Sequence, residues 1–572
     1  MKRLLAILIC ATACTAQAQT VTTAITGGTL VNSDGSAPVP DGVIVMRNGR
    51  IVAAGSSATV SVPKNAKTID AKGKWIVPGY VDAHVHFFQS GGLYTRPDGL
   101  DLRKVVPYEQ EIADIKANLA DTFARYLASG ITAVADVGGP MWNFEVRDRA
   151  EASAHAPHVA VTGPLISTWK PPVLSDAADP PIIAATSPDH ARELVRHELP
   201  KKPDYVKIWY VVRKGETPQQ FLPIVSAVID ESHKHGVRVA VHATELETAR
   251  AALSAGADIL VHGVDDKPVD PDFIALLHKR NAIYSTTLTV MGNYRRTFEQ
   301  LMHFSPETYA LGNPTVMGTL FDLRQLPDDI VPARIRAMIA AQAAIEEPTV
   351  LLQNLKTVQD AGIRIAVGTD AGNIGTLPGP SIYDEYDAMA KAGITPAQIL
   401  TDTTLHGAML MGKEGQLGSI ARGKMADLVI LNSDPLIDVA HLHDIAYVVK
   451  DGVVLRQADL IPSTPAAVVQ RQVNAYNARD IDAFLETYAT DAKIHAKDGT
   501  IIMRGHTAMR SQYAPMFEQN PALHVKIEKR SASGDRIVDN ELVTGLASGK
   551  TVRAKATYQV KEGVIAEVWF DQ

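Results

Sequence analysis

Apolar and polar residues alternate in three different ways along the chain, and the first pattern runs from Thr23 to Trp75. Short apolar runs are broken here by Gly, Asn and Asp. One example is the run 43–46 (Val-Ile-Val-Met), which precedes Arg47-Asn48-Gly49-Arg50. Apolar runs bounded by turn residues indicate β-hairpins. We therefore expect a small sheet domain at residues 19–78.

A second pattern, strand, loop and helix in repetition, runs from Gly79 to about residue 410. Continuous runs rich in Val, Ile and Ala predict strands that are buried on both faces, as in a parallel sheet. Eight alternating units predict an α/β protein with a (β/α)8 TIM barrel over residues 79–411, rather than an open doubly wound sheet. The eight expected strands are 80–86, 131–137, 158–163, 205–210, 238–243, 258–264, 282–288 and 364–370.

Two long connections are expected to cover the mouth of this barrel. The segment 289–363, between the seventh and eighth strands, is mostly helical in its pattern, and the loop 169–188 after the third strand is rich in proline. Specificity in such a barrel depends on the loops at the C-terminal ends of the strands. We therefore expect specificity to depend on these two segments and on the loop after the first strand.

The third pattern begins after the barrel, where residues 412–458 return to short strands. These strands are expected to join residues 19–78 in one composite β-sandwich that flanks the barrel. A linker at 459–465 leads to residues 466–572. In this segment, helical periodicity over 468–488 precedes alternating strands at 523–529, 541–547, 551–560 and 564–570. Helices followed by strands predict a separate α+β domain.

The first residues predict export. Lys2 and Arg3 precede the apolar stretch 4–13, and Ala16-Gln17-Ala18 supplies the small-x-small pattern of a signal-peptidase site. The apolar stretch is too short to remain in a bilayer as a spanning helix. Residues 1–18 are therefore interpreted as a cleaved signal peptide, and the protein as periplasmic or secreted.

Both cysteines of the chain, Cys10 and Cys14, belong to this segment. The mature protein is therefore expected to have no disulfide and no thiolate ligand, and a lipid anchor at Cys14 is the alternative to release. No later segment has the ~20 apolar residues of a membrane span. The formal net charge of −7, without a long basic run, gives no sign of nucleic-acid binding.

Six polar side chains share one position, the C-terminal end of a predicted barrel strand: His84 and His86 in the first strand, Lys207 in the fourth, His242 in the fifth, His262 in the sixth and Asp370 in the eighth. Each alone has an ordinary structural explanation, such as a buried imidazole bonded to a carbonyl or a lysine that reaches for water. Barrel active sites form at these strand ends. The six together therefore predict one catalytic centre.

The residue types indicate metal chemistry. Imidazole and carboxylate are the ligands that a divalent ion such as zinc takes when no thiolate is available, although they also suit manganese, cobalt and iron. Four histidines and one aspartate exceed the needs of one catalytic metal, so we expect two. A buried lysine beside two cations should lose its proton, and the neutral amine of Lys207 can then react with carbon dioxide to give a bridging carbamate. A hydroxide between the metals would be the nucleophile, with Asp370 as the proton carrier.

Four segments carry a family resemblance: 77–86 (Val-Pro-Gly-Tyr-Val-Asp-Ala-His-Val-His), 130–134 (Gly-Ile-Thr-Ala-Val), 368–372 (Gly-Thr-Asp-Ala-Gly) and 417–429 (Leu-Gly-Ser-Ile-Ala-Arg-Gly-Lys-Met-Ala-Asp-Leu-Val). From Thr23 to about Leu455 the chain resembles the amidohydrolase superfamily, closest to its imidazolonepropionase-related and Xaa-Pro-dipeptidase-like branch. Residues 466–572 resemble the NTF2-like (SnoaL-like) cone fold. The resemblance implies two metal sites: one on His84, His86 and Asp370, the other on His242 and His262, with carboxylated Lys207 as the bridge.

The predicted function is hydrolysis of an amide-type C–N bond in a small molecule, such as a dipeptide, an N-acyl amino acid or a cyclic amide. The expected cofactors are two divalent ions, zinc first among them. Tyr210, Thr286 and His406 are candidate substrate contacts. The C-terminal domain is expected to make a homo-oligomer, although His495 and Asp491 are possible interior polar groups of a second enzyme on this fold.

Two other functions remain open at this point. The motif His242-Ala243-Thr244-Glu245 resembles that of mononuclear deaminases of the same superfamily, in which the glutamate carries the proton. An acid in the first turn of a helix is also favoured by the helix dipole alone. Lys207 argues against a deaminase, because those enzymes have no bridging lysine. The other possibility is an exported binding protein that keeps the barrel without turnover.

Overall fold

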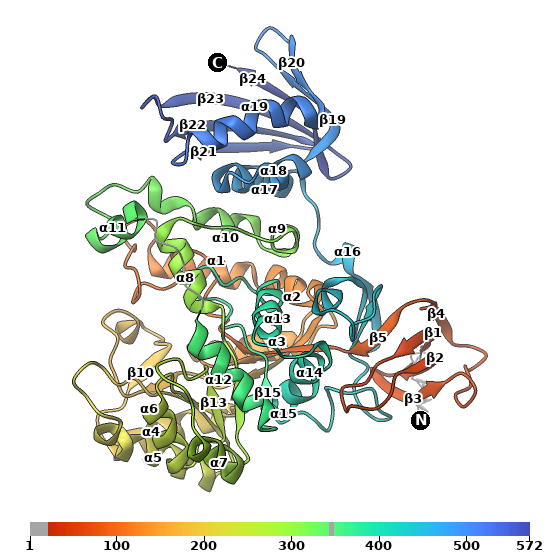
Figure 1. Cartoon of the computed structure of the whole chain (residues 1–572), viewed down its shortest axis with the longest axis vertical. Coiled ribbons are helices and arrows are strands. Elements are labelled where there is room, and N and C mark those ends of the chain that lie inside the picture. Colours follow the sequence, from red (N-terminus) through yellow and green to blue (C-terminus); the bar gives the residue numbers. More distant parts are fainter. Residues whose placement is uncertain (1–20, 342–347, 572) are drawn as a thin grey trace, which may run out of the picture.

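The computed structural model describes residues 21–341 and 348–571. The expected signal peptide at 1–18, with Cys10 and Cys14, lies outside these ranges. Within them, no helix combines the length and the apolar character that crossing a membrane requires. Figure 1 shows three parts: a sheet domain near the N-terminus, a central α/β body, and a C-terminal domain stacked on the helices of that body.

Strands from both sides of the barrel segment form one eight-stranded sheet, in the order β18-β17-β16-β5-β1-β2-β3 with β4 beside β1. The link is the antiparallel pairing of β5 with β16, in which Val77 lies opposite Val429. The strands are β1 (Thr22–Leu30), β2 (Val39–Arg47), β3 (Arg50–Ser56), β4 (Lys67–Asp70), β5 (Trp75–Pro78), β16 (Leu428–Leu431), β17 (Ile445–Lys450) and β18 (Val453–Arg456).

This sheet is branched at β1. The first half of β1 pairs with β4 and its last two residues pair with β5. The branch falls where the register of β1 against β2 shifts on either side of Gly28. An irregularity of this kind bends a strand and increases its twist, which lets one strand serve two neighbours.

The eight barrel strands are present in the predicted order, which confirms the α/β fold class. They lie in two parallel sheets, β6-β7-β8 and β10-β9-β11-β12-β13-β14-β15. With two additional short strands, β9 and β10, the strands of these two sheets are β6 (Tyr80–Val85), β7 (Ile131–Asp136), β8 (His158–Val161), β9 (Leu165–Ser167), β10 (Ile182–Ala184), β11 (Val206–Trp209), β12 (Val239–His242), β13 (Ile259–Val261), β14 (Ile283–Ser285) and β15 (Ile365–Ala366). The short strands β9 and β10 were not predicted.

Backbone hydrogen bonds connect these two sheets at both edges, as a closed barrel requires. Ala83 N donates to Val367 O and Asp370 N to His84 O, both at 2.7 Å, which places the segment after β15 beside β6. At the other edge, Asp204 N donates to Val161 O at 2.9 Å, which connects β8 to the start of β11. The C-terminal ends of the strands therefore meet at one mouth.

Helices surround the barrel and also cover its mouth (Figure 1). The outer helices are α1 (Tyr108–Ala117), α2 (Leu119–Ala128), α3 (Asn143–Glu151), α4 (Pro188–Glu198), α5 (Pro218–Lys234), α6 (Leu246–Ala255), α7 (Pro271–Arg280), α12 (Thr349–Asp360), α13 (Ser381–Lys391), α14 (Pro396–Thr401) and α15 (Gly407–Met411). The predicted helical segment between β14 and β15 contains α8 (Val290–Glu299), α9 (Pro306–Leu311), α10 (Pro314–Thr319) and α11 (Ala333–Ala341).

An ionic cluster fastens the barrel to the branched sheet. His158, the first residue of β8, has Nε2 2.9 Å from an oxygen of Asp427 and 3.4 Å from one of Asp451. Lys450 Nζ lies 3.0 Å from the same nitrogen and is ion-paired with Asp451. We call these four residues the sheet–barrel cluster.

The C-terminal domain packs its first helices on α9 and α10 (Figure 1). Its helices are α17 (Pro465–Ala478), α18 (Ile481–Glu486) and α19 (Gly505–Gln519), preceded by the short α16 (Gln457–Leu460). Its sheet has the order β20-β19-β24-β23-β22-β21. The strands are β19 (Tyr488–His495), β20 (Ile501–Arg504), β21 (His524–Ser533), β22 (Arg536–Thr544), β23 (Val552–Lys561) and β24 (Val564–Asp571).

The contact with the barrel segment is a shared apolar core. Met302, Phe304 and Met317 of the segment that covers the mouth belong to the same buried cluster as Val468 and Val469 of α17. Asn474 Nδ2 also donates to Pro314 O at 2.8 Å. The C-terminal domain therefore supports the cover of the barrel mouth.

The two polar residues considered as an interior site of this domain differ in position. His495 is buried, stacks on Trp569 with ring centroids 5.0 Å apart, and pairs with Glu567 at 2.9 Å. Asp491 is exposed, because the alternation of β19 directs its neighbour Ala492 into the core. The two therefore do not form a common interior pair.

Candidate metal centre

The structure brings all six predicted site residues to one cavity of about 1090 Å³ at the barrel mouth. They come from five strands and the residues that follow them: His84 and His86 from β6, Lys207 from β11, His242 from β12, His262 after β13 and Asp370 after β15. Strand geometry explains the first pair. Residues two apart in an extended chain project to the same side, so both imidazoles enter the cavity.

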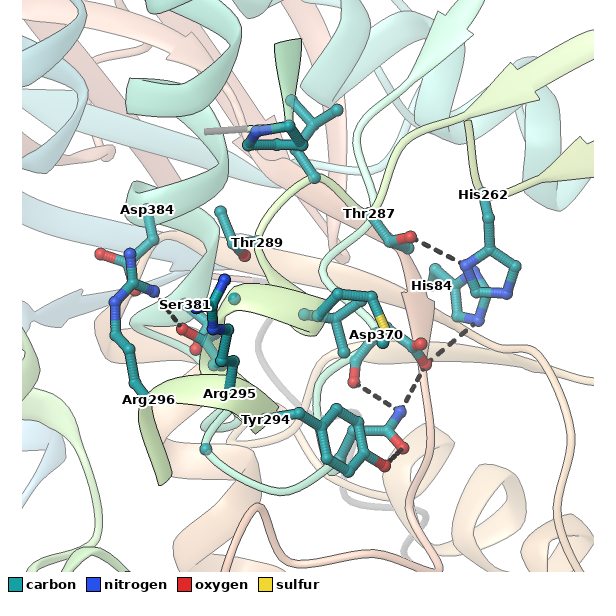
Figure 2. A pocket seen from close by; sticks show the side chains of 18 of the residues that line it. His84, His262, Thr287, Thr289, Tyr294, Arg295, Arg296, Asp370, Ser381 and Asp384 are labelled. Carbon is teal, nitrogen blue, oxygen red and sulfur yellow. Dashed lines mark hydrogen bonds and ion pairs between the residues drawn. The ribbon is translucent and has the colours of Figure 1, made fainter. Parts of the chain in front are cut away.

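The distances between these groups are those of a compact cluster. His84 Nε2 and His86 Nε2 lie 3.3 and 3.1 Å from the same oxygen of Asp370, Oδ1. The ring of His262 lies 4.7 Å from that of His84 and 4.5 Å from that of His242, centroid to centroid. His84, His262 and Asp370 offer ligand atoms within 4.8 Å of one another (Figure 2).

Burial sets the protonation states of these groups. It lowers the pKa of His84 and of His242 well below the ordinary value, and that of His262 to about 3. Lys207 is 1% exposed, and burial lowers the pKa of its amine to about 7. Removing a charge from water disfavours the cationic form of both residue types. The imidazoles of His84, His242 and His262 are therefore neutral, which is the form that binds a metal.

Two of the histidines are oriented by hydrogen bonds on the nitrogen that faces away from the cluster. His86 Nδ1 lies 2.7 Å from Gly138 O. A carbonyl only accepts, so Nδ1 carries a hydrogen, and Nε2 faces Asp370. His262 Nδ1 lies 2.8 Å from Thr287 Oγ1, which fixes the plane of that ring. Such partners orient metal-binding histidines in many proteins.

Glu385 holds the loop that carries Thr287. Its fully buried carboxylate accepts the backbone N–H of Leu288 at 2.7 and 2.9 Å and that of Thr289 at 3.2 Å. This loop follows β14 directly. The carboxylate therefore fixes the position of the loop from which the Thr287 hydroxyl contacts His262.

The backbone at two of the site residues is strained. His262 has φ of 72° and Asp370 has φ of 62°, in the left-handed region that few residues other than glycine adopt. Each of these residues follows its strand directly or closely. Conformations of this kind cost about 1–3 kcal/mol and collect at functional sites. The conformation of His262 also explains why β13 ends at Val261, earlier than predicted.

Polar atoms without a protein partner mark where a metal would bind. Among the described residues, both ring nitrogens of His84 and Nδ1 of His242 are buried and accept or donate no hydrogen bond. His84 Nε2 is 3.3 Å from Asp370 Oδ1, but the geometry is not that of a hydrogen bond. Buried polar atoms are nearly always satisfied. Neutral imidazoles and one carboxylate around such atoms fit a divalent ion of the zinc type.

The rest of the cavity has an apolar side and a charged side. Trp209, two residues after Lys207 in β11, lines it and packs on Trp169 with ring centroids 5.6 Å apart. Figure 2 shows Arg295 and Arg296 of α8 and Asp384 of α13 on the side away from His84 and His262. The cavity is therefore large and mixed in polarity, as drug-sized ligands require.

The three expected substrate contacts are not among the residues that line this cavity. Tyr210 is buried and donates its hydroxyl to Pro218 O. Thr286 is fully buried and bonds to the backbone of Gly368. His406 lies in a π-helical turn, where Nδ1 meets Asp402 and the carbonyl of Ile365 at the start of β15, the opposite end of that strand.

Their neighbours line the cavity instead. Trp209 and Thr287 are one residue away from Tyr210 and Thr286. Successive residues of an extended chain face opposite sides, so an error of one residue reverses the direction of the side chain. Glu245, the residue of the alternative deaminase, immediately precedes α6 and is not among the described residues that line the cavity.

Three further residues of the site were not predicted from the sequence. Asn373 Nδ2 donates to Asp370 Oδ1 at 2.7 Å. Arg96 and the Tyr294 hydroxyl in turn bond to Asn373 Oδ1, at 2.6 and 2.7 Å. The only available signal was the position of Asn373 three residues after Asp370, since the other two lie far away in the sequence.

Comparison with known proteins agrees with this arrangement. The amidohydrolase family matches residues 75–456, and the SnoaL-like domain matches residues 469–568. Imidazolonepropionase from Symbiobacterium thermophilum is 27% identical over 421 residues, which are 70% of this chain and 85% of that protein.

Solved structures show the same fold. A Xaa-Pro dipeptidase with methionine bound in its active site has a TM-score of 0.56 and 22% identity, over 76% of this chain and 100% of the other. Molinate hydrolase has a TM-score of 0.58 and 22% identity, over 78% and 97%.

Proposed function

Since the chain belongs to the amidohydrolase family, we propose that it is a metal-dependent hydrolase of an amide-type C–N bond and works with two divalent ions. One observation carries this proposal. Four imidazoles, a buried lysine and an aspartate converge on one cavity at the barrel mouth, and three of the imidazole nitrogens are buried without a hydrogen-bond partner among the described residues.

The ligand set divides between two ions. His84, His86 and Asp370 would hold one, His242 and His262 would hold the other, and Lys207 would bridge them after reaction of its neutral amine with carbon dioxide. The ions would polarise the carbonyl of the substrate and lower the pKa of water to ~7.

The residues of the chain supply orientation and proton transfer. Asp370 is placed to take the proton of the attacking water and to return it to the leaving nitrogen, as general acid–base catalysis requires. Thr287 fixes the plane of His262, and Gly138 O fixes the tautomer of His86. The cover formed by α8 to α11 encloses the substrate, and Trp209 provides a flat apolar wall beside Lys207.

The substrate is proposed to be a dipeptide, an N-acyl amino acid or a cyclic amide. Imidazolonepropionase and the Xaa-Pro dipeptidase, which this chain resembles, support a small molecule of this kind. The cavity of about 1090 Å³ has room for a large apolar acyl group as well. Residues 1–18 are proposed to direct export, which N-terminal sequencing of the mature protein tests.

The deaminase alternative loses support because Glu245 does not line the cavity. A binding protein without turnover remains the second candidate, and it is tested together with the first.

The decisive experiment is a hydrolysis screen with the zinc-loaded mature protein. Xaa-Pro dipeptides, N-acyl amino acids and cyclic amides are offered, and metal ions per chain are counted in parallel. We expect two ions and turnover of at least one class, abolished in Asp370→Asn. Two ions without turnover of any class would favour the binding protein. One ion that is retained in Lys207→Ala would contradict the two-metal site.

A further inference from the structure

We infer that Asn373, held by Arg96 and Tyr294, is the positioning residue that fixes the carboxylate of Asp370 for both metal binding and proton transfer. The inference rests on the proposed function, because it assigns Asp370 those two roles. It adds three residues, Arg96, Tyr294 and Asn373, which come from three separate parts of the fold and are not candidate metal ligands themselves.

The orientation of the Asn373 amide follows from its partners. Arg96 has only donors, so the atom 2.6 Å from its Nη1 is the amide oxygen of Asn373. The amide nitrogen therefore faces Asp370 and donates to Oδ1 at 2.7 Å. This is the same oxygen that lies 3.3 and 3.1 Å from the Nε2 atoms of His84 and His86.

The hydrogen-bonding capacity of this amide is fully used. Its oxygen accepts from Arg96 and from the Tyr294 hydroxyl, at 2.6 and 2.7 Å. Its nitrogen donates to Oδ1 and to the backbone oxygen of Asp370, at 2.7 and 3.0 Å. An amide has two acceptor sites and two donor hydrogens. No rotation of the side chain preserves these four bonds, so Asn373 has one orientation.

Arg96 is itself fixed. Its Nε and Nη2 form a two-pronged pair with the carboxylate of Asp98, at 2.8 and 2.7 Å. Both side chains are largely buried, at 17% and 5% exposure. Paired and charge-assisted hydrogen bonds of this type are the strongest in proteins. Arg96 therefore serves Asn373 and is not a free cation for a substrate.

The chain of bonds also explains the conformation of Asp370. Its φ of 62° is in the left-handed region, and the Asn373 amide bonds both its backbone oxygen and its side chain. A residue that merely closed the turn would need only the backbone bond. The second bond selects the rotamer of the carboxylate. Since Tyr294 lies in α8, the cover of the cavity is connected to Asp370 through Asn373.

The test compares Asn373→Ala and Tyr294→Phe with a matched control, Tyr309→Phe. Tyr309 is buried, and its hydroxyl has no hydrogen-bond partner among the described residues. For each variant, the zinc dissociation constant is measured by chelator competition, kcat and KM are measured on a substrate from the screen, and the melting temperature reports on folding.

We expect Asn373→Ala to lower kcat by about 10- to 100-fold and to weaken zinc binding by about tenfold, the range found for residues behind metal ligands. KM should change far less, because the lost interaction belongs to the reacting groups. Tyr294→Phe should lower kcat by about threefold, and Tyr309→Phe should leave both quantities unchanged.

Two outcomes would overturn the inference. One is a folded Asn373→Ala protein whose kcat and zinc affinity both stay within about twofold of wild type. The other is an equal effect of Tyr294→Phe and Tyr309→Phe. If the wild type hydrolyses nothing, the proposed function fails, but the zinc measurements still decide whether Asn373 positions Asp370.

Discussion

The hydroxyl of Thr287 provides a sharp test of the metal site, because a single substitution removes its bond to His262. Thr287→Val keeps the branched shape of the side chain and deletes only the group that lies 2.8 Å from His262 Nδ1. Thr287 is 5% exposed, so no bulk water replaces the lost partner. The imidazole then has one fewer constraint on its plane.

The magnitude follows from that burial. Leaving one buried polar group without its partner costs about 1–3 kcal/mol. If this cost falls on the metal-bound form, zinc affinity decreases by about 5- to 150-fold, since 1.4 kcal/mol corresponds to a factor of ten. His262 also holds a left-handed backbone conformation, so the free ring can turn away more readily. We expect a decrease near the middle of that range.

Zinc affinity is measured by competition with a chromophoric chelator, and the melting temperature of the metal-free protein is measured alongside. Thr404→Val is the matched control. Thr404 is fully buried, and its hydroxyl bonds to the backbone oxygen of Leu400 within its own helical segment. A Thr287→Val protein with unchanged zinc affinity, or an equal loss in Thr404→Val, would refute the role given to the Thr287 hydroxyl.

Three further outcomes are expected. Lys207→Met should bind fewer metal ions per chain and lose hydrolysis; retention of two ions would contradict the bridging role. Burial lowers the pKa of His158, but Asp427 and Asp451 outweigh it and raise the pKa to about 9. The sheet–barrel cluster therefore contributes up to about 3 kcal/mol below pH ~6.5, lost as the pH rises through about 9. Urea unfolding across this range measures it, and His158→Gln should remove the dependence. Glu385→Ala should destabilise the fold by about 1–3 kcal/mol for each orphaned N–H, and a change below about 0.5 kcal/mol in urea unfolding would contradict its role.

The convergence of the candidate metal ligands on one cavity could be predicted because one geometric rule governs it. Parallel barrel strands end at one mouth, so His242 and His262 could be paired without knowledge of the loops. The substrate contacts depend on a second rule, the alternation of side-chain direction along a strand, which requires the exact register. The side chains of Tyr210 and Thr286 point away from the cavity that their neighbours line, and a run of buried apolar residues gives no sign of which face is which.

The network behind Asp370 could not be predicted, for a different reason. Arg96, Tyr294 and Asn373 are separated by long stretches of chain, and no spacing relates them. The sequence around Arg96 and Tyr294 also contains no motif that points to a site. Only the path of the cover over the barrel mouth brings α8 beside the loop after β15.

Part of the cover of the cavity shares its core with the C-terminal domain. Met302 and Phe304 line the cavity and also belong to the buried cluster that includes Val468 of the C-terminal domain. Since tightly packed interiors transmit changes of volume, a repacked α17 would change the shape of the cavity without touching a single metal ligand. Natural variation in the C-terminal domain is therefore a route by which relatives of this chain could acquire different substrates while keeping the same chemistry.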